Sequence, residues 1–386
     1  MGRFRIFLLV STLLLVIINI YLSRKYKKLA KSYDTNIPEY AATLILFSGL
    51  LIFLSSLFLQ DWIYRHRLLT IPVRYFSSFY LGTLIYSLLF FIAGDILAFL
   101  GSFYMRDKKI IYFFSRVYAK GLIVPIAAVL ITLYAFYNAV DYKVTSYELS
   151  INKISSVPSL EIVMVSDLHV GTSVTKKQLV IIKDMIEELS PDMFLICGDI
   201  FDHASYDEIM RFSAETLGSI KTPYGTYFVT GNHEYYLGDI SKLLSYFEGT
   251  EIRVIQDEML SIGDIYLAGR KDLRESDRAP LSQILNGADK SRPIIVLDHQ
   301  PNAIDEAIEN KVDFQLSGHT HNGQLFPFNY IASLANHTHY GLHEEGEFKA
   351  VISSGAGTWK YPIRTGSSSE IVRVRLNFIN DKTTSK

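Results

Sequence analysis

The chain has 386 residues, of which 49 % are hydrophobic and 20 % are charged, and its mean hydropathy is +0.19. This balance is too apolar for an ordinary soluble protein and too charged for a chain lying wholly in a membrane, so we expect two unlike regions. A net charge of −1 excludes a generally basic nucleic-acid-binding protein. The single cysteine, Cys197, excludes an intramolecular disulfide and a multi-cysteine zinc site.

The change in composition near Tyr142 predicts a transmembrane region over residues 1–142 and a separate domain over residues 143–386. A membrane-spanning helix needs about 20 mostly apolar residues. Four stretches meet this length: Phe4–Leu22, Ala41–Gln60, Phe76–Leu100 and Val117–Val140. The first could instead be a cleavable signal peptide, but no small-x-small cleavage site follows it, so we favour four transmembrane helices.

Two features of this region bear on its role. Lys and Arg are more numerous in the loops after the first and third spans than on the opposite side, which predicts that residues after Val140 lie outside the cytoplasm. Asp95, inside the third span, either serves an ion or proton pathway or reaches interfacial water or a basic loop from near the helix end.

The remaining sequence alternates between apolar runs typical of buried strands and amphipathic helical patterns. The predicted strands are Leu160–Val165, Met193–Cys197, Thr226–Thr230, Ile265–Ala268, Ile294–Leu297 and Phe314–Leu316. The predicted helices are Thr175–Leu189, capped by Thr175, and Tyr206–Ile220, Ile240–Phe247 and Asn302–Asn310. This order predicts an α/β domain with a largely parallel sheet. The tail, over Ala350–Ser354 and Glu370–Phe378, is predicted to be all-β and to complete a second sheet.

Polar side chains follow five of the predicted strands directly. They are Asp167 and His169, Asp199, Asn232 and His233, Asp298 and His299, and His319 and His321. Ligands of open α/β sheets bind beyond the carboxyl ends of the strands, so we expect these segments to converge. The two-residue spacing within Asp167/His169 and His319/His321 places each pair on one side of an extended chain.

Oxygen and imidazole ligands without a thiolate suit Mn²⁺, Fe²⁺ or Zn²⁺ rather than Ca²⁺. These candidate ligands exceed what one ion needs, so the sequence predicts two ions that share a carboxylate, an arrangement that serves phosphoryl transfer. Glycines precede Asp199, Asn232 and His319, where the backbone would have to pass close to a metal or phosphate.

The motifs Asp-x-His, Gly-Asp, Gly-Asn-His-Glu, a lone His and Gly-His-Thr-His, in this order, resemble the calcineurin-like metallophosphoesterases over Glu161–Gln324. The segment Ser317–Gln324 is similar to a bacterial branch with membrane-associated phosphodiesterases and lipid-precursor pyrophosphatases. The resemblance implies a four-layer α/β sandwich, hydrolysis of phosphoric esters and two divalent metal ions.

The resemblance also implies a role for each residue. One metal would be held by Asp167, His169, Asp199 and His321, and Asp199 would bridge to a second metal completed by Asn232, His299 and His319. His233 would be a catalytic residue that contacts the phosphate and protonates the leaving oxygen, without binding a metal.

Several residues keep two interpretations. Asp202 and His203 either line the pocket or form a solvated helix entry, and Asp298 either orients a ligand or is a plain strand-end carboxylate. His337, His339 and His343 either bind a third metal or lie in a loop near the site, where His339 would touch substrate; we favour the loop. Cys197 is interpreted as a buried strand residue rather than a nucleophile.

These features together predict a membrane-anchored, binuclear metal-dependent phosphoesterase. Its substrate would be a phosphodiester or pyrophosphate, such as a phospholipid, a lipid-linked precursor or a cell-envelope phosphodiester. The alternative is a membrane sensor or scaffold that binds phosphorylated ligands without turnover. Nothing in the sequence indicates nucleic-acid binding, and the oligomeric state stays open.

Overall fold

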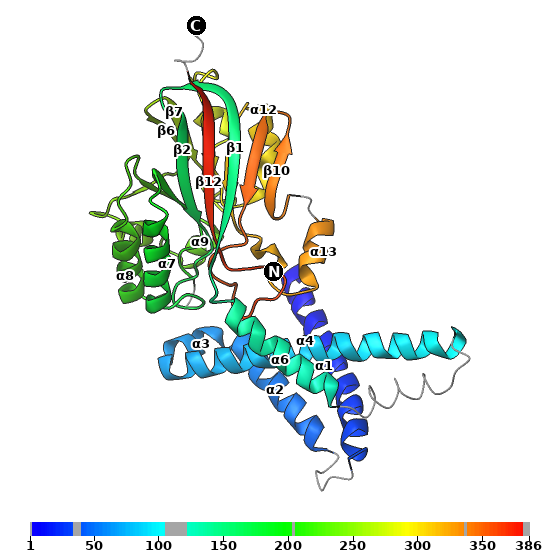
Figure 1. Ribbon diagram of the computed structural model, residues 1–386. Coiled ribbons are helices and arrows are strands. Elements are labelled where there is room, and N and C mark those ends of the chain that lie inside the picture. Colours follow the sequence, from blue (N-terminus) through cyan, green and yellow to red (C-terminus); the bar gives the residue numbers. More distant parts are fainter. Residues whose placement is uncertain (1, 34–39, 105–121, 203–204, 336–337, 381–386) are drawn as a thin grey trace. The chain divides into compact units, whose positions relative to one another are not determined.

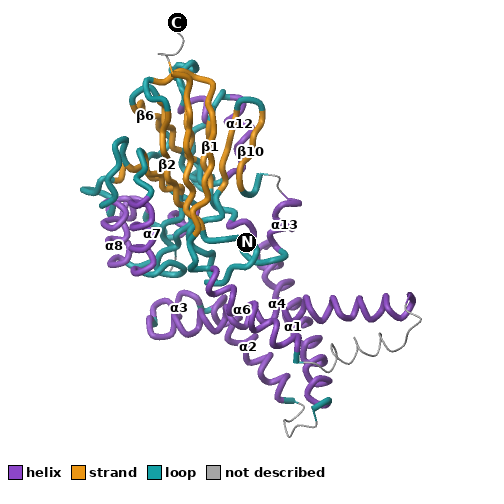
Figure 2. Tube along the Cα trace, in the orientation of Figure 1, coloured by secondary structure: helices purple, strands orange, loops and turns teal. Residues whose placement is uncertain are grey.

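A computed structural model of the protein describes residues 2–33, 40–104, 122–202, 205–335 and 338–380, and the chain divides into two compact units (Figures 1 and 2). The first unit, Met1–Phe136, is helical where it is described, and the second, Tyr137–Lys386, contains the described strands. The division falls shortly before the domain boundary that we predict after residue 142.

The first unit is built from long apolar helices. Among the residues that the structure describes, three helices are long and apolar enough to cross a membrane, over Leu9–Lys31, Ala41–Phe58 and Leu68–Gly101. The beginning of the fourth predicted span, from Val117, lies outside the described residues, and its described part is a shorter apolar helix. The helices are α1 (Gly2–Lys31), α2 (Ala41–Phe58), α3 (Gln60–Arg65), α4 (Arg67–Tyr104) and α6 (Ile123–Asn138), which ends in the second unit.

Asp95 of α4 is paired with side chains of α1. It forms an ion pair with Lys25, and the hydroxyl of Tyr21 donates to its Oδ2 at 2.7 Å. Lys25 belongs to the basic segment that follows the first predicted span, and the Asp95 side chain is half-exposed. This geometry fits the interpretation in which Asp95 reaches a basic segment from near the helix end.

The second unit contains two six-stranded sheets. The first sheet has the order β1 (Lys143–Ser155), β12 (Glu370–Asn380), β2 (Ser159–Val165), β3 (Met193–Cys197), β4 (Thr226–Val229), β5 (Ile252–Val254). The second has the order β10 (Gly341–Glu345), β11 (Phe348–Ile352), β9 (Phe314–Ser317), β8 (Ile294–Leu297), β7 (Ile265–Gly269), β6 (Glu258–Ile262). Parallel pairing links β2 to β5 through β3 and β4, and β11 to β7 through β9 and β8.

Alternating side chains of these strands build three layers of core. Apolar residues of both sheets, such as Leu195 of β3 and Leu297 of β8, share the central cluster. The opposite face of the first sheet packs against α7 (Lys176–Glu188) and α8 (Asp207–Gly218), and that of the second packs against α11 (Leu281–Ile284) and α12 (Ile304–Glu309). The order of helices, sheet, sheet, helices is the four-layer α/β sandwich that we predict.

The predicted strands and helices of this unit are confirmed, including the cap at Thr175, which forms a capping box with Gln178. The expectation that both tail strands complete a second sheet is wrong: β11 joins the second sheet, but β12 inserts between β1 and β2 of the first. The alternation of β12 explains this place, because Val374 faces the central core while Arg373 pairs with Glu161 of β2 at 3.0 Å on the outer face.

Candidate metal centre

The loops that follow β2, β3, β4, β8 and β9 carry the predicted site residues. Five of these residues have a left-handed backbone, with φ of 53° at Asp167, 47° at His169, 55° at Asp199, 71° at His319 and 48° at His321. Such conformations are costly for side chains other than glycine, and they concentrate at functional sites where the surrounding structure enforces them. The strand ends therefore hold these side chains in place at an energetic cost.

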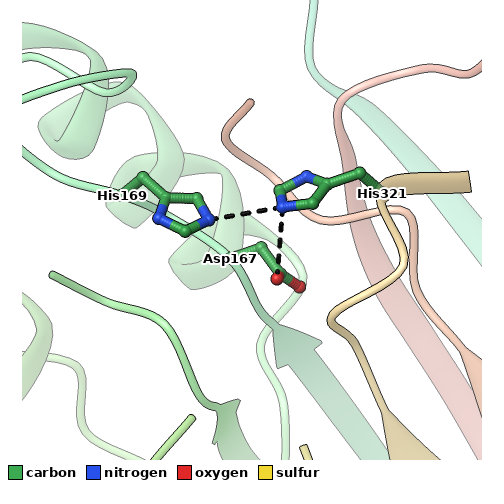
Figure 3. A group of neighbouring side chains, drawn as sticks. All are labelled: Asp167, His169 and His321. Atoms are coloured by element: carbon green, nitrogen blue, oxygen red, sulfur yellow. Dashed lines mark hydrogen bonds and ion pairs between the residues drawn. The ribbon is translucent and has the colours of Figure 1, made fainter. Parts of the chain in front are cut away.

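Asp167, His169 and His321 form a first group of potential ligands, all buried (Figure 3). The Nε2 atoms of the two histidines lie 3.3 Å apart, and His321 Nε2 lies 3.5 Å from Asp167 Oδ1. Burial lowers the pKa of His169, and burial together with the neighbouring His169 ring lowers the pKa of His321 well below its ordinary value. Neutral imidazoles facing one carboxylate are the form that binds a cation.

Asp199, His299 and His319 form a second group, and a third group of His169, Asp199 and His233 links it to the first. Asp199 Oδ2 lies 3.3 Å from His299 Nε2 and 3.9 Å from His169 Nε2. His299 Nδ1 donates to the carbonyl of Cys197 at 2.7 Å, so Nε2 is the ring atom that faces Asp199. Burial lowers the pKa of His299, but the charge of Asp199 outweighs it and raises that pKa well above its ordinary value. Burial alone would raise the pKa of Asp199, but the neighbouring histidines hold it well below its usual range, so the carboxylate is ionised.

Asn232, the first residue of α9 (Asn232–Tyr236), is buried beside these groups, and its Oδ1 has no hydrogen-bond partner among the described residues. A buried, unpartnered amide oxygen is costly unless a further ligand satisfies it. Gly231 and Gly198 make the close approach possible, because a Cβ atom at Gly231 would lie 2.3 Å from Asp199 Oδ1, and one at Gly198 would lie 2.3 Å from His299 Nδ1. The donors present thus fit divalent cations bound by nitrogen and oxygen.

His233 is placed between Asp199 and Asp202. Its backbone N–H donates to Asp199 Oδ1 at 2.8 Å, and its Nδ1 lies 3.0 Å from Asp202 Oδ1. Burial lowers the pKa of His233, but the hydrogen bond to Asp202 and the charge of Asp199 outweigh it and raise the pKa to about 9. The ring is therefore protonated at neutral pH and can donate a proton. Asp202 is therefore a buried residue that lines the site, which is the first of the two interpretations given above. His203 lies outside the described residues.

Glu234 is fully buried, and its role was not predicted from its place in the motif. Its carboxylate accepts hydrogen bonds from the backbone N–H groups of Asp199 at 2.9 Å, Gly231 at 2.8 Å and Phe201 at 3.1 Å. Burial and the charge of Asp199 raise its pKa to about 8. Glu234 joins the loops after β3 and β4, and the signal that could have identified it is its place as the third helical residue after Gly231, the acid position of a capping box.

Asp298 and His339 lie near the groups without joining them. Asp298 binds Arg278, and its Oδ2 lies 3.3 Å from Arg270 Nη1, while the adjacent His299 is oriented by the Cys197 carbonyl. His339 is anchored through its backbone carbonyl, which accepts from Thr320 Oγ1 at 2.6 Å. Neither His339 nor His343 belongs to a potential metal group of the described residues. His337 lies outside the described residues.

Cys197 is buried in β3, where its Sγ lies 3.3 Å from the Leu316 carbonyl, the acceptor of its thiol. Burial and the nearby carboxylates raise its thiol pKa well above the usual value. A protonated, inaccessible thiol is unsuited to nucleophilic attack, so the interpretation of Cys197 as a strand residue is consistent with the structure.

Comparison with known proteins gives the same picture of the chain. Residues 160–323 match the family model for calcineurin-like phosphoesterases. The chain is 34 % identical over 280 residues to a "Transmembrane protein with metallophosphoesterase domain" of Danio rerio, covering 68 % of this chain and 64 % of that protein. It is 36 % identical over 223 residues to a metallophosphoesterase of Helicobacter pylori, covering 56 % and 60 %. It is 32 % identical over 266 residues to one of Campylobacter jejuni, covering 66 % and 70 %. The chain thus spans somewhat less than two thirds of the first two relatives.

Proposed function

The chain belongs to the calcineurin-like metallophosphoesterase family, and from this membership and its site we propose that it is a membrane-anchored hydrolase of phosphoric esters that uses two divalent metal ions. The observation that carries the proposal is the position of Asp199, whose carboxylate lies close to histidines of both ligand groups. One ionised carboxylate between two sets of imidazole and oxygen donors is suited to bridging two cations.

The proposed ligands of one metal are Asp167, His169, Asp199 and His321, and those of the other are Asp199, Asn232, His299 and His319. Without a thiolate among them, Mn²⁺, Fe²⁺ and Zn²⁺ are the candidates. Two such ions, when bound, supply an activated nucleophile and neutralise charge on the phosphate oxygens.

Two further residues have proposed roles other than metal binding: His233 as a proton donor and Glu234 as a support of the backbone. His233, held by Asp202, donates a proton to the leaving oxygen from a ring that is mostly buried. Glu234 accepts from the backbone N–H groups of Asp199 and Gly231, and so fixes the distance between the loops that follow β3 and β4. A proton donor supported in this way favours turnover over binding of a phosphorylated ligand without reaction.

The three apolar helices and the transmembrane relatives support membrane association. We propose that the chain crosses the membrane several times and that residues 143–386 form the catalytic domain on the extracytoplasmic side. A lipid-linked or cell-envelope phosphodiester or pyrophosphate would then be the substrate. Fusions of alkaline phosphatase and of a cytoplasm-dependent fluorescent protein after Lys386 test the orientation. Phosphatase activity supports it, and a bright fluorescent fusion with an inactive phosphatase overturns it.

The activity is tested on the full chain in detergent or lipid nanodiscs. After treatment with a chelator, the protein is reloaded with Mn²⁺ and assayed with bis-p-nitrophenyl phosphate, p-nitrophenyl phosphate and pyrophosphate. We expect metal-dependent hydrolysis of at least one of them, and none by an Asp199→Asn variant prepared in parallel. Metal-loaded protein that binds two ions but hydrolyses none of the three would overturn the proposal in favour of a binding function.

A further inference from the structure

Helix α13 (Phe328–Ala335) exposes apolar side chains, whereas a helix on a water-facing surface exposes polar ones. Leu334 is 85 % exposed and Tyr330 61 %, and Phe328 and Ile331 are also exposed. Asn329, a polar residue of the same helix, has its Oδ1 buried. A helix on the surface of a soluble domain turns its apolar side inward, so water does not account for this arrangement.

The exposed apolar surface extends beyond α13 to a second segment. The Gln324 side chain accepts from the backbone N–H of Trp359 at 2.7 Å and donates to the carbonyl of Tyr361 at 3.0 Å, and the N–H of Phe326 donates to Thr365 Oγ1 at 3.0 Å. These bonds join the two segments into one surface. We call it the apolar rim; its exposed residues are Phe326, Phe328, Tyr330, Ile331, Leu334 and Trp359.

The sequence around α13 is free of charged residues, and in the second segment of the rim Lys360 follows Trp359. Residues 314–343 contain no Asp, Glu, Lys or Arg, a run of thirty residues in a domain that is otherwise rich in them. By contrast, α7 buries Leu179, Ile182 and Ile186, and its exposed side mixes the apolar Val180 and Ile181 with charged residues such as Glu187, which pairs with Lys183 at 2.6 Å. Aromatic and aliphatic side chains with no formal charge are typical of a surface that lies in the bilayer interface.

The rim also adjoins the place where the chain leaves its last apolar helix. Asn138, the final residue of α6 and part of the second unit, donates to the carbonyls of Arg364 at 3.1 Å and Ser367 at 2.9 Å. Ser367 Oγ in turn donates to the carbonyl of His321 at 3.0 Å. The segment that carries Trp359 thus connects the end of an apolar helix, the rim and a candidate metal ligand.

We propose that the apolar rim lies in the interface of the bilayer that the apolar helices cross, and that it holds the metal centre at the membrane surface. His321 precedes α13 by only seven residues, so phosphate groups of membrane lipids would reach the site from the bilayer. This inference rests on the proposed membrane attachment, and it names a lipid bilayer, rather than a second copy or another protein, as the partner of the rim.

The test uses the full chain in phosphatidylcholine–phosphatidylglycerol nanodiscs, with an environment-sensitive NBD label at Leu334→Cys. The native cysteine, Cys197, is fully buried. The matched control is Ile181→Cys, since Ile181 is also exposed but lies on the charged helix α7. We expect spin-labelled lipids to quench NBD at position 334 severalfold more strongly than at 181, and dithionite in the water to reduce the label at 334 more slowly.

The native Trp359 is a second reporter that needs no label, because Trp62→Phe leaves it as the only tryptophan. We expect brominated lipids to quench its emission. Equal reduction of both NBD labels by dithionite, with no lipid quenching, would overturn the inference. Protection of position 334 from both lipid and water quenchers would also overturn it, by showing that protein covers the rim. Neither readout requires turnover, so failure of the phosphoesterase proposal would leave this result intact, and the reverse also holds.

Discussion

Two aspartates of the site, Asp202 and Asp298, each lie close to a histidine, but only Asp202 contacts the imidazole ring of its histidine. Asp202 lies 3.0 Å from Nδ1 of His233, and its other oxygen accepts from Thr172 at 3.0 Å. Asp298 directly precedes His299 in the chain, but it is bound by Arg278 and Arg270. The Nδ1 of His299 donates to a backbone carbonyl instead.

The difference matches the two roles that we propose, a proton donor at His233 and a metal ligand at His299. A carboxylate on Nδ1 stabilises the charged imidazole, as at His233, whereas a carbonyl on Nδ1 selects the tautomer whose Nε2 can bind a cation. Adjacency in sequence therefore says little about which acid serves which histidine. The variants below test this assignment, beginning with the carboxylate that both histidines approach.

Asp199→Asn should have the largest effect, because a bridging carboxylate neutralises two cations at once. We expect turnover to fall to background and at least one metal ion to be lost, while the fold is retained. Elemental analysis and kinetics on the same preparation measure both quantities. Normal turnover with full metal content would end the two-metal interpretation and with it the contrast between the two histidines.

His233→Ala should keep both metal ions while turnover falls by about 10²-fold to 10⁴-fold, the usual loss for a general acid. The loss should be greatest for esters with poor leaving groups and smallest for nitrophenyl esters, whose leaving group hardly needs a proton. A leaving-group series on both proteins measures this. Equal losses across the series would leave His233 only an electrostatic role, and loss of metal would place it among the ligands.

Asp202→Asn should reduce turnover by about 10-fold to 100-fold, as expected for a partner that orients a reacting group. The pKa of His233 is raised to about 9, so the proton it needs is present at neutral pH and is lost as the pH rises toward that value. Without the Asp202 charge this pKa should fall, and the alkaline limb of the rate profile should move to lower pH. An unchanged limb would assign the alkaline loss to another group.

The sequence predicted the elements whose apolar runs are strong and whose ends carry polar side chains, as at Met193–Cys197 before Asp199. It did not predict that β12 lies inside the first sheet, because pairing across more than two hundred residues leaves no local pattern. The role of Glu234 was not predicted for a similar reason. Its partners are backbone N–H groups, which are present in almost every residue and so leave no pattern in the sequence. The exposed apolar side of α13 was not predicted, because a short apolar run in a sequence does not show whether its side chains are buried or exposed.

Asp298→Asn should have the smallest effect on turnover of the folded protein, because His299 keeps its bond to the Cys197 carbonyl. The effect should instead fall on stability. Removing one partner from a buried ion pair typically costs about 3–5 kcal/mol. Here Arg278 would lose the carboxylate that it binds, whereas Arg270 would keep its ion pair with Glu306 at 2.7 Å, so we expect the loss at the lower end of that range. Thermal unfolding and metal content, measured together, test this.

A matched control for that variant is Asp313→Asn, because Asp313 is also mostly buried and paired, with Lys153 at 2.7 Å, but belongs to no ligand group. We expect both variants to unfold at lower temperature and both to keep two metal ions. If Asp298→Asn alone loses metal, then Asp298 orients His299 through the backbone that joins them, and the two Asp–His pairs of the site are more alike than their hydrogen bonds indicate.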